Sequence, residues 1–186
     1  MVANRFNQAS MKGRWGVSRG RAVCRGDTRF LQWKFPITEF DVSADVVYDD
    51  RTGRRKFIIH TCMNDENING VWAYYWRGQV TMNSGSIRSW GWYARPAGLI
   101  WRPGEVATVR FTHTPGKSEF YPFELTINGT YAISGDPLSW SWYGRGAEAK
   151  GAIAFNFDNG TGWIDNVSIT GKIDMQWFAE LTRGIR

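Results

Sequence analysis

Aromatic residues spaced two apart are the part of this sequence that points most directly to chemistry. They occur in three segments, and the members are Trp72, Tyr74, Trp76, Trp90, Trp92, Trp140 and Trp142. Because successive side chains of a β-strand point to opposite faces, each set forms a row of rings on one face of a sheet. A sugar ring packs its apolar C–H face on such a row, and polar neighbours such as Asn83 and Arg88 bind its hydroxyl groups. The rows therefore predict a glycan-binding surface.

The same aromatic residues suit two other roles. A large sandwich core is filled by such rings, and an interface with a partner subunit is enriched in Trp, Tyr and Arg. The chain contains 11 Trp, 7 Tyr and 11 Phe among its 186 residues, which is more than a single core requires. The sequence leaves core, interface and glycan site as open alternatives.

Paired carboxylic acids are what glycoside hydrolysis requires, and the sequence offers one weak pair. Glu39 and Asp41 stand two residues apart, but alternation places both on the outward face of a strand as ordinary polar residues. Other acids and bases lie in the chain without a spacing that fixes their geometry, namely Asp65, Glu66, His113, Glu119 and Glu124. We therefore assign no catalytic residue, and an enzyme is the alternative to a binding module.

Asp165 stands out in the final hairpin, residues 150–171. Trp163, Val167 and Ile169 share one parity in its return strand, and that parity places Asp165 inward with them. A buried carboxylate needs a partner, because burying an uncompensated charge is too costly. Asp165 therefore accepts hydrogen bonds from loop amides, pairs with an arginine, holds a cation, or sits at a bulge that turns it outward.

Asp158, Asn159 and Asp165 are the candidate ligands for a metal ion. Hard cations favour carboxylate and carbonyl oxygens, so these residues together with backbone oxygens suit a structural Ca²⁺. Capping of the turn by Asp158 and Asn159 is the alternative. Zinc is not expected, because the two His and two Cys residues lack the spacing of a ligand set. No other cofactor is expected.

Alternating apolar and polar residues predict strands along most of the chain. Besides both halves of residues 150–171, the expected strands cover residues 29–34, 39–47, 56–62, 71–76, 79–82, 86–93, 106–113, 119–127 and 131–133. Asn128-Gly129 between two alternating runs predicts a type I′ hairpin. These patterns predict an all-β protein built as an antiparallel β-sandwich. The expected parts are a basic arm at 1–13, the sandwich at 14–172, and a tail at 173–186 that forms a short amphipathic helix or a docking arm.

Several short motifs resemble the concanavalin A-like jelly-roll group, which includes laminin-G-like domains, carbohydrate-binding modules and glycan-cleaving enzymes. In chain order they are Trp15-Gly16-Val17 with Gly20, Pro103-Gly104-Glu105, residues 123–129 and residues 163–171. The resemblance implies a jelly roll over residues 15–171 in which structural calcium is frequent. Glu39-Phe40-Asp41 also resembles the start of the E-x-D-x-x-E strand of laminarinase relatives. Position 44 is alanine where the third acid would stand.

Basic residues concentrate at the N-terminus. Positions 1–29 hold seven basic residues and a single acid, so this segment accounts for the whole net charge of +6. The residues expected to form an assembly arm are Arg5, Lys12, Arg14 and Arg19. Such an arm suits an acidic protein surface or another anionic surface, and a solvated tail is the plainer explanation. Nucleic acid is not the expected partner.

Signals for the compartment are few. The first residues lack the apolar region of a signal peptide, and no run of about 18 apolar residues is present. We therefore expect synthesis in the cytoplasm without membrane insertion. The chain has two cysteines, Cys24 and Cys62, which could form one disulfide, and the sequence does not decide whether they do.

These patterns together favour a non-catalytic jelly-roll module that recognises glycans or attaches to a surface. We expect it to act as a homo-oligomer or in a larger assembly, such as the capsid, decoration or tail of a virion, with protein neighbours bound through the terminal arms. The alternative is a glycoside hydrolase or polysaccharide lyase of the same fold group.

Overall fold

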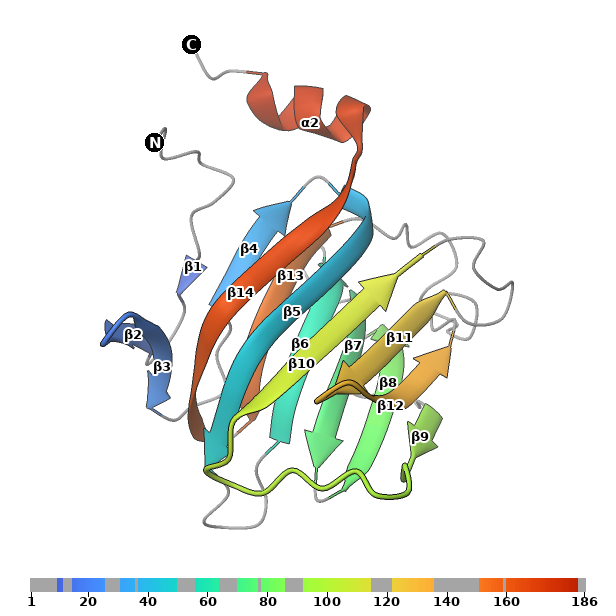
Figure 1. Ribbon diagram of the computed structural model, residues 1–186. Helices are drawn as coiled ribbons and strands as arrows, with labels where there is room; N and C mark the ends of the chain where they lie inside the picture. Colours follow the sequence, from blue (N-terminus) through green and yellow to red (C-terminus); the bar gives the residue numbers. More distant parts are fainter. Residues whose placement is uncertain are drawn as a thin grey trace.

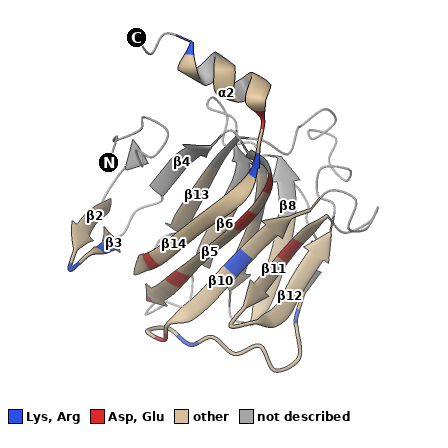
Figure 2. Cartoon of the chain, turned by 45° about the horizontal axis from the view of Figure 1, so that its top comes forward, with Lys and Arg blue, Asp and Glu red and all other residues tan. Residues whose placement is uncertain are grey.

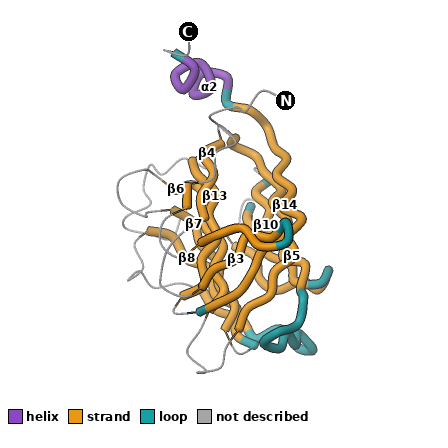
Figure 3. Tube along the Cα trace, turned by 90° about the vertical axis from the view of Figure 1, so that its left-hand side faces the viewer, coloured by secondary structure: helices purple, strands orange, loops and turns teal. Residues whose placement is uncertain are grey.

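The computed structural model describes residues 10–11, 15–25, 31–35, 37–49, 56–63, 70–76, 78–85, 92–114, 122–135, 151–158 and 160–183. These residues form two seven-stranded sheets and one helix. Each strand pairing between them is antiparallel. The sheets stack face to face, as Figures 1 and 3 show from the front and from the side. The expected all-β sandwich is confirmed.

Sheet A has the strand order β1-β4-β13-β6-β7-β8-β9. Its strands are β1 (Ser10–Met11), β4 (Leu31–Phe35), β13 (Gly151–Asp158), β6 (Lys56–Met63), β7 (Gly70–Trp76), β8 (Gln79–Gly85) and β9 (Trp92–Ala94). Sheet B has the order β12-β11-β10-β5-β14-β3-β2. Its strands are β12 (Thr130–Gly135), β11 (Phe123–Ile127), β10 (Ala107–His113), β5 (Ile37–Asp49), β14 (Thr161–Ile173), β3 (Arg21–Arg25) and β2 (Trp15–Ser18).

The core lies between the two sheets and follows the predicted alternation. In β10, Ala107, Val109 and Phe111 are buried, whereas Thr108 and Arg110 point to solvent. The same alternation holds in β11, where each buried residue is large and apolar. Period-two patterning therefore turns one face of each strand inward, and the buried apolar area is the main stabilising contribution.

The hairpin between β11 and β12 turns at Asn128 and Gly129. Their φ angles are 52° and 72°, which is the backbone that a type I′ turn requires at both central positions. The side chain of Asn128 also accepts a hydrogen bond from the amide of Thr108 on the neighbouring strand, at 2.9 Å. The hairpin predicted from Asn-Gly is confirmed.

The return strand β14 differs from the predicted parity. Ile164 is the residue that faces the core, with 1% of its surface exposed, so the inward placement of Trp163 and Asp165 is wrong. A register shift between Asp165 and Ser168 coincides with a φ of 48° at Asn166, which marks a β-bulge. Asp165 lies at this bulge and its carboxylate is 3.3 Å from Nε of Arg21. Two of the expected solutions, the bulge and the arginine partner, therefore occur together.

The chain after β14 forms helix α2 (Met175–Thr182), as expected for the tail. Figures 1 and 3 show that α2 stands beyond the end of the sandwich, with Met175 67% exposed. Among the described residues, no helix combines the length and the apolar character needed to cross a bilayer. Arg19 lies in the turn between β2 and β3, and residues 5, 12 and 14 lie outside the described ranges.

Cys24 is a buried thiol on β3. Its sulfur lies 3.8 Å from the carbonyl oxygen of Gly160, to which the S–H group donates. A disulfide between Cys24 and Cys62, one of the two outcomes the sequence left open, is therefore not formed.

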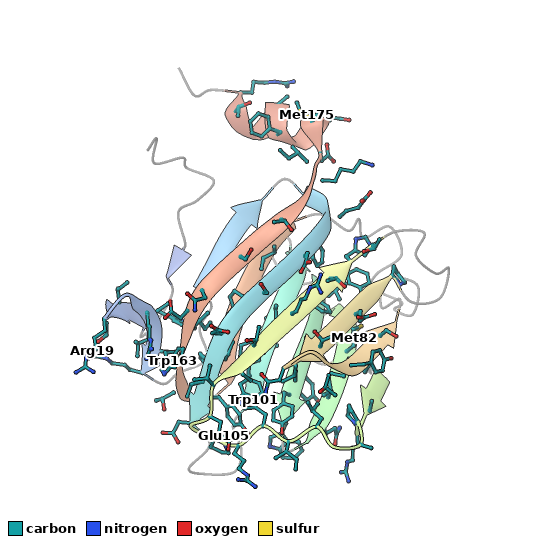
Figure 4. The ribbon with its side chains drawn as sticks, in the orientation of Figure 1. Arg19, Met82, Trp101, Glu105, Trp163 and Met175 are labelled. Atoms are coloured by element: carbon teal, nitrogen blue, oxygen red, sulfur yellow. The ribbon has the colours of Figure 1, made fainter. Side chains whose placement is uncertain are left out.

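One end of the sandwich is closed by Trp101, in the segment that joins β9 to β10. Its indole packs between Tyr48 and Tyr75, with ring centroids 4.7 and 5.1 Å away, and Figure 4 shows it at the lower ends of the strands. The hydroxyls of both tyrosines donate to the carbonyl oxygen of Trp101, and the hydroxyl of Tyr75 also accepts from the Trp101 amide. This buried network fixes the segment against both sheets.

We expect Tyr75→Phe to lower the free energy of unfolding by about 2 kcal/mol, because it leaves the buried amide of Trp101 without its acceptor. Tyr48→Phe is expected to cost about 1 kcal/mol, because the Trp101 carbonyl keeps its bond to Tyr75. Urea unfolding of the two variants measures the difference, and equal losses would contradict this account of the network.

Candidate functional site

Strand β7 carries an aromatic row on the face that points away from the core. The inward positions of this strand are Val71, Ala73 and Tyr75, which are all buried. Trp72, Tyr74 and Trp76 occupy the alternate positions, and the side chains of Tyr74 and Trp76 are half-buried. Because the outer positions do not contribute to the core between the sheets, Tyr74 and Trp76 are not the sandwich-core residues that the sequence left as one alternative.

Strand register places further residues beside this row on the outer face of sheet A. Tyr74 stands between Ile58 of β6 and Thr81 of β8, and Ile58 in turn pairs with Asn156 of β13. We call these four residues, Asn156, Ile58, Tyr74 and Thr81, the Tyr74 row. The row crosses four neighbouring strands at one level of the sheet.

A second row lies on the same face, two residues further along each strand. Trp72 pairs with His60 of β6 on one side and with Asn83 of β8 on the other, and His60 pairs with Ala154 of β13. We call Ala154, His60, Trp72 and Asn83 the Trp72 row. Asn83, a polar residue expected to accompany the aromatic residues, therefore stands directly beside Trp72 in the sheet.

Three polar residues of these rows are deeply buried, and the sequence did not single them out. His60 and Asn156 are 2% exposed and Thr81 is 5% exposed, although all three occupy outer positions of sheet A. Within the part of the chain that the structure describes, the hydroxyl of Thr81 and the amide oxygen Oδ1 of Asn156 have no hydrogen-bond partner. Leaving such an atom unsatisfied costs about 1–3 kcal/mol, so these atoms are suited to a partner from outside the chain.

His60 is held as a neutral imidazole. Burial lowers its pKa to about 3, because the charged form is disfavoured away from water. An unfolded chain protonates this histidine near its ordinary pKa, whereas the folded chain does not. The unfolded state thus binds more protons below that value, so stability is lost as the pH falls through it.

Lowering the pH from 7 to 5.5 is therefore expected to reduce the free energy of unfolding by about 1 kcal/mol through His60 alone. Urea unfolding at the two pH values measures the loss, and the His60→Gln variant should lack this part of it. An equal pH dependence in the variant would contradict the assignment.

The outer face of sheet B has a different character. Its acids are paired with bases: the guanidinium of Arg110 binds both carboxylate oxygens of Asp41, and Nζ of Lys172 is 3.3 Å from Oε1 of Glu39. The hydrogen bond that Arg110 donates to Asp41 raises the pKa of Arg110. Figure 2 shows these opposite charges across β5, β10 and β14. This face is a solvated ladder of charge pairs.

A hydrogen-bonded carboxylate continues this ladder. Asp45 accepts hydrogen bonds from Nδ2 of Asn166, at 2.8 Å, and from the hydroxyl of Thr108, at 2.7 Å. These bonds favour the charged form and lower the pKa of Asp45. The bulge at Asn166 therefore serves a structural contact within sheet B.

No protein-family model and no curated protein sequence matches the chain. Solved structures do match it. The carbohydrate-binding module CBM66 from Bacillus subtilis aligns with a TM-score of 0.67 and 13% identity, over 87% of this chain and 94% of that one. The carbohydrate recognition domain of Emp46p aligns with a TM-score of 0.62 and 10% identity, over 92% of this chain and 94% of that domain. A putative glycosyl hydrolase from Parabacteroides distasonis aligns with a TM-score of 0.59 and 16% identity, over 85% of this chain and 90% of that one.

The chain has a concanavalin A-like jelly-roll fold. In this jelly roll, several of the predicted site residues fall outside the described ranges: Arg88, Trp90, Trp140, Trp142 and Asn159. Trp92 begins β9 and pairs with Met82, whose side chain is in the core, whereas Tyr93 pairs with Thr81 of the Tyr74 row. The described part of the jelly roll thus brings together Trp72, Tyr74, Trp76 and Asn83.

Of the three predicted calcium ligands, the structure describes the side chain of Asp165, whereas Asn159 and the side chain of Asp158 lie outside what it describes. Asp158 is the last residue of β13, and Asp165 is bound to Arg21, whose guanidinium also lies 4.1 Å from the ring centroid of Trp163. Among the described residues, no three His, Cys, Asp or Glu side chains are grouped as a metal site requires. Asp165 therefore does not fit a calcium site, and calcium binding stays a prediction.

Proposed function

We propose that this jelly roll is a non-catalytic carbohydrate-binding module whose ligand lies on the outer face of sheet A. The observation that supports this most is the pair of half-buried rings, Tyr74 and Trp76, on that face. Thr81 stands beside Tyr74 in the sheet and Asn156 lies in the same row beyond Ile58, and a buried polar atom of each lacks a partner among the described residues. A sugar uses both kinds of contact, because its C–H face stacks on a ring and its hydroxyls need hydrogen-bond partners.

The structural similarities support this proposal at the level of the fold. Two of the three similar structures are named for carbohydrate binding or recognition, and both match over most of their length. Since one fold hosts many functions, the argument for this chain depends on the residues of the face itself.

A carbohydrate-active enzyme is the second candidate, because one similar structure is a putative glycosyl hydrolase. The described acids do not favour it. Glu39 and Asp41 lie on sheet B and are bound to Lys172 and Arg110, so neither is poised as a general acid. His113 points into the core while Glu124, on the paired strand β11, points outward, so the two side chains lie on opposite faces of sheet B.

The remaining expectations concern assembly and location. Attachment to a surface, oligomerisation, protein neighbours bound through the terminal arms, a place in a virion and cytoplasmic synthesis stay predictions. The proposed glycan site does not depend on assembly or location, because a single chain contributes both the Tyr74 row and the Trp72 row.

A glycan array probed with the full chain, followed by a product assay on every glycan retained, tests the proposed function. We expect retention without release of shorter sugars. Release of product would replace the binding module by an enzyme, and failure to retain any glycan would refute glycan recognition.

A further inference from the structure

The Tyr74 row also specifies the kind of sugar, an inference that depends on the proposed function. The buried polar atoms of the row that lack a partner among the described residues lie at its two ends, at Asn156 on β13 and at Thr81 on β8, with Ile58 and Tyr74 between them. Three strand spacings separate the ends, about 14 Å at the usual distance between neighbouring strands. This length exceeds a single sugar ring, so one monosaccharide does not reach both ends.

The unsatisfied atoms at the ends need hydrogen-bond donors. Oδ1 of Asn156 only accepts, and the hydroxyl of Thr81 both donates and accepts. A sugar hydroxyl supplies a donor and an acceptor at once. Carboxylate and sulfate groups supply acceptors alone, so an anionic group facing Asn156 would leave Oδ1 unsatisfied.

The charge of the described side chains also argues against an anion. None of the described side chains of the Tyr74 row and the Trp72 row is charged: Asn156, Thr81 and the Tyr74 hydroxyl are neutral groups, and burial keeps His60 neutral. An anion buried beside neutral groups is not compensated for the water it loses. Arg110 and Lys172 lie on the outer face of sheet B, on the opposite side of the sandwich, and each binds an acid there.

We propose that the ligand is an uncharged oligosaccharide of two or more rings lying across the Tyr74 row. Its apolar ring faces pack on Ile58 and Tyr74, and hydroxyl groups near its two ends bind Oδ1 of Asn156 and the hydroxyl of Thr81.

The test uses the full chain and two sets of glycans of matched length, one of neutral oligosaccharides and one carrying sialic acid, uronic acid or sulfate. The monosaccharides of each set are included. We expect affinity for neutral oligosaccharides, with the corresponding monosaccharides and the anionic set at least tenfold weaker.

Two variants address the atoms directly. Thr81→Val and Asn156→Leu each remove an unsatisfied polar group while keeping similar volume, so we expect about tenfold weaker binding and an unchanged or raised melting temperature. Thr108→Val, which removes a hydroxyl on the opposite sheet, is the matched control and should bind as the native chain does.

Each result bears on the inference. Equal or tighter binding of anionic glycans, monosaccharides bound as tightly as oligosaccharides, or full affinity in Thr81→Val would overturn it while leaving glycan recognition intact. Binding of no glycan in either set would instead refute the proposed function, and this inference with it.

Discussion

Replacing Tyr74 by alanine is expected to weaken glycan binding about 30-fold while the sandwich remains folded. The ring stands at the centre of the outer face of sheet A, with Ile58 and Thr81 on either side. Truncating a central aromatic anchor of a binding site costs about 2 kcal/mol or more, which is about 30-fold in affinity. Calorimetric titration with a glycan retained on the array measures the loss.

Tyr131→Ala is the matched control for this experiment. Tyr131 lies on β12 of sheet B, is 56% exposed and bonds to the hydroxyl of Ser134 at 2.8 Å. Its removal should leave affinity unchanged. Equal losses in the two variants, or none in Tyr74→Ala, would show that the ring of Tyr74 does not contact the ligand.

Gly162→Ala is expected to destabilise the protein by about 3 kcal/mol, which lowers the melting temperature by roughly 10 °C. A Cβ atom at this position would lie 2.3 Å from the carbonyl oxygen of Val47 and 2.6 Å from the ring of Phe157. The first of these atoms belongs to the backbone of the paired strand β5, so it cannot move aside without breaking the sheet register. Glycine is required here by close packing.

Gly16→Ala provides the comparison for the thermal unfolding experiment. No atom lies within 4 Å of a Cβ built at Gly16, which also sits in a strand of sheet B. Its effect should stay within about 0.5 kcal/mol. If both variants melted together, the close approach of β5, β13 and β14 at Gly162 would not be a determinant of stability.

Much of the sandwich could be predicted from local pattern. Strands such as β10 and β11 alternate strictly, because one face meets the core and the other meets water, and Asn128-Gly129 has the backbone freedom that a tight hairpin needs. These features depend on residues that are neighbours in sequence. Period-two patterning is therefore sufficient to find them.

The bulge in β14 could not be predicted in the same way. Parity from Val167 and Ile169 placed Trp163 and Asp165 inward, but the register shift at Asn166 reverses which residues face the core on its two sides. A single extra residue changes the face of the following residues, and strand parity alone does not indicate where such a residue is inserted. Ile164 is consequently the core residue of that segment.

The candidate site was predicted in part. The Trp72, Tyr74 and Trp76 spacing indicates a row, but β7 is apolar on both faces, so the sequence does not tell which set faces the core. The polar residues His60, Thr81 and Asn156 come from three other strands and meet this row only through strand register. Their strands contain other polar residues as well, so the sequence alone does not mark these three as a site before the strand order is known.

Mapping the ligand by amide chemical-shift changes tests the central claim most directly, because it reports where on the chain a neutral oligosaccharide binds. The account predicts that the changes concentrate at Ile58, Tyr74, Thr81 and Asn156, which four separate strands of sheet A contribute. Changes concentrated instead on the charge ladder of sheet B, around Asp45 and Arg110, would contradict it.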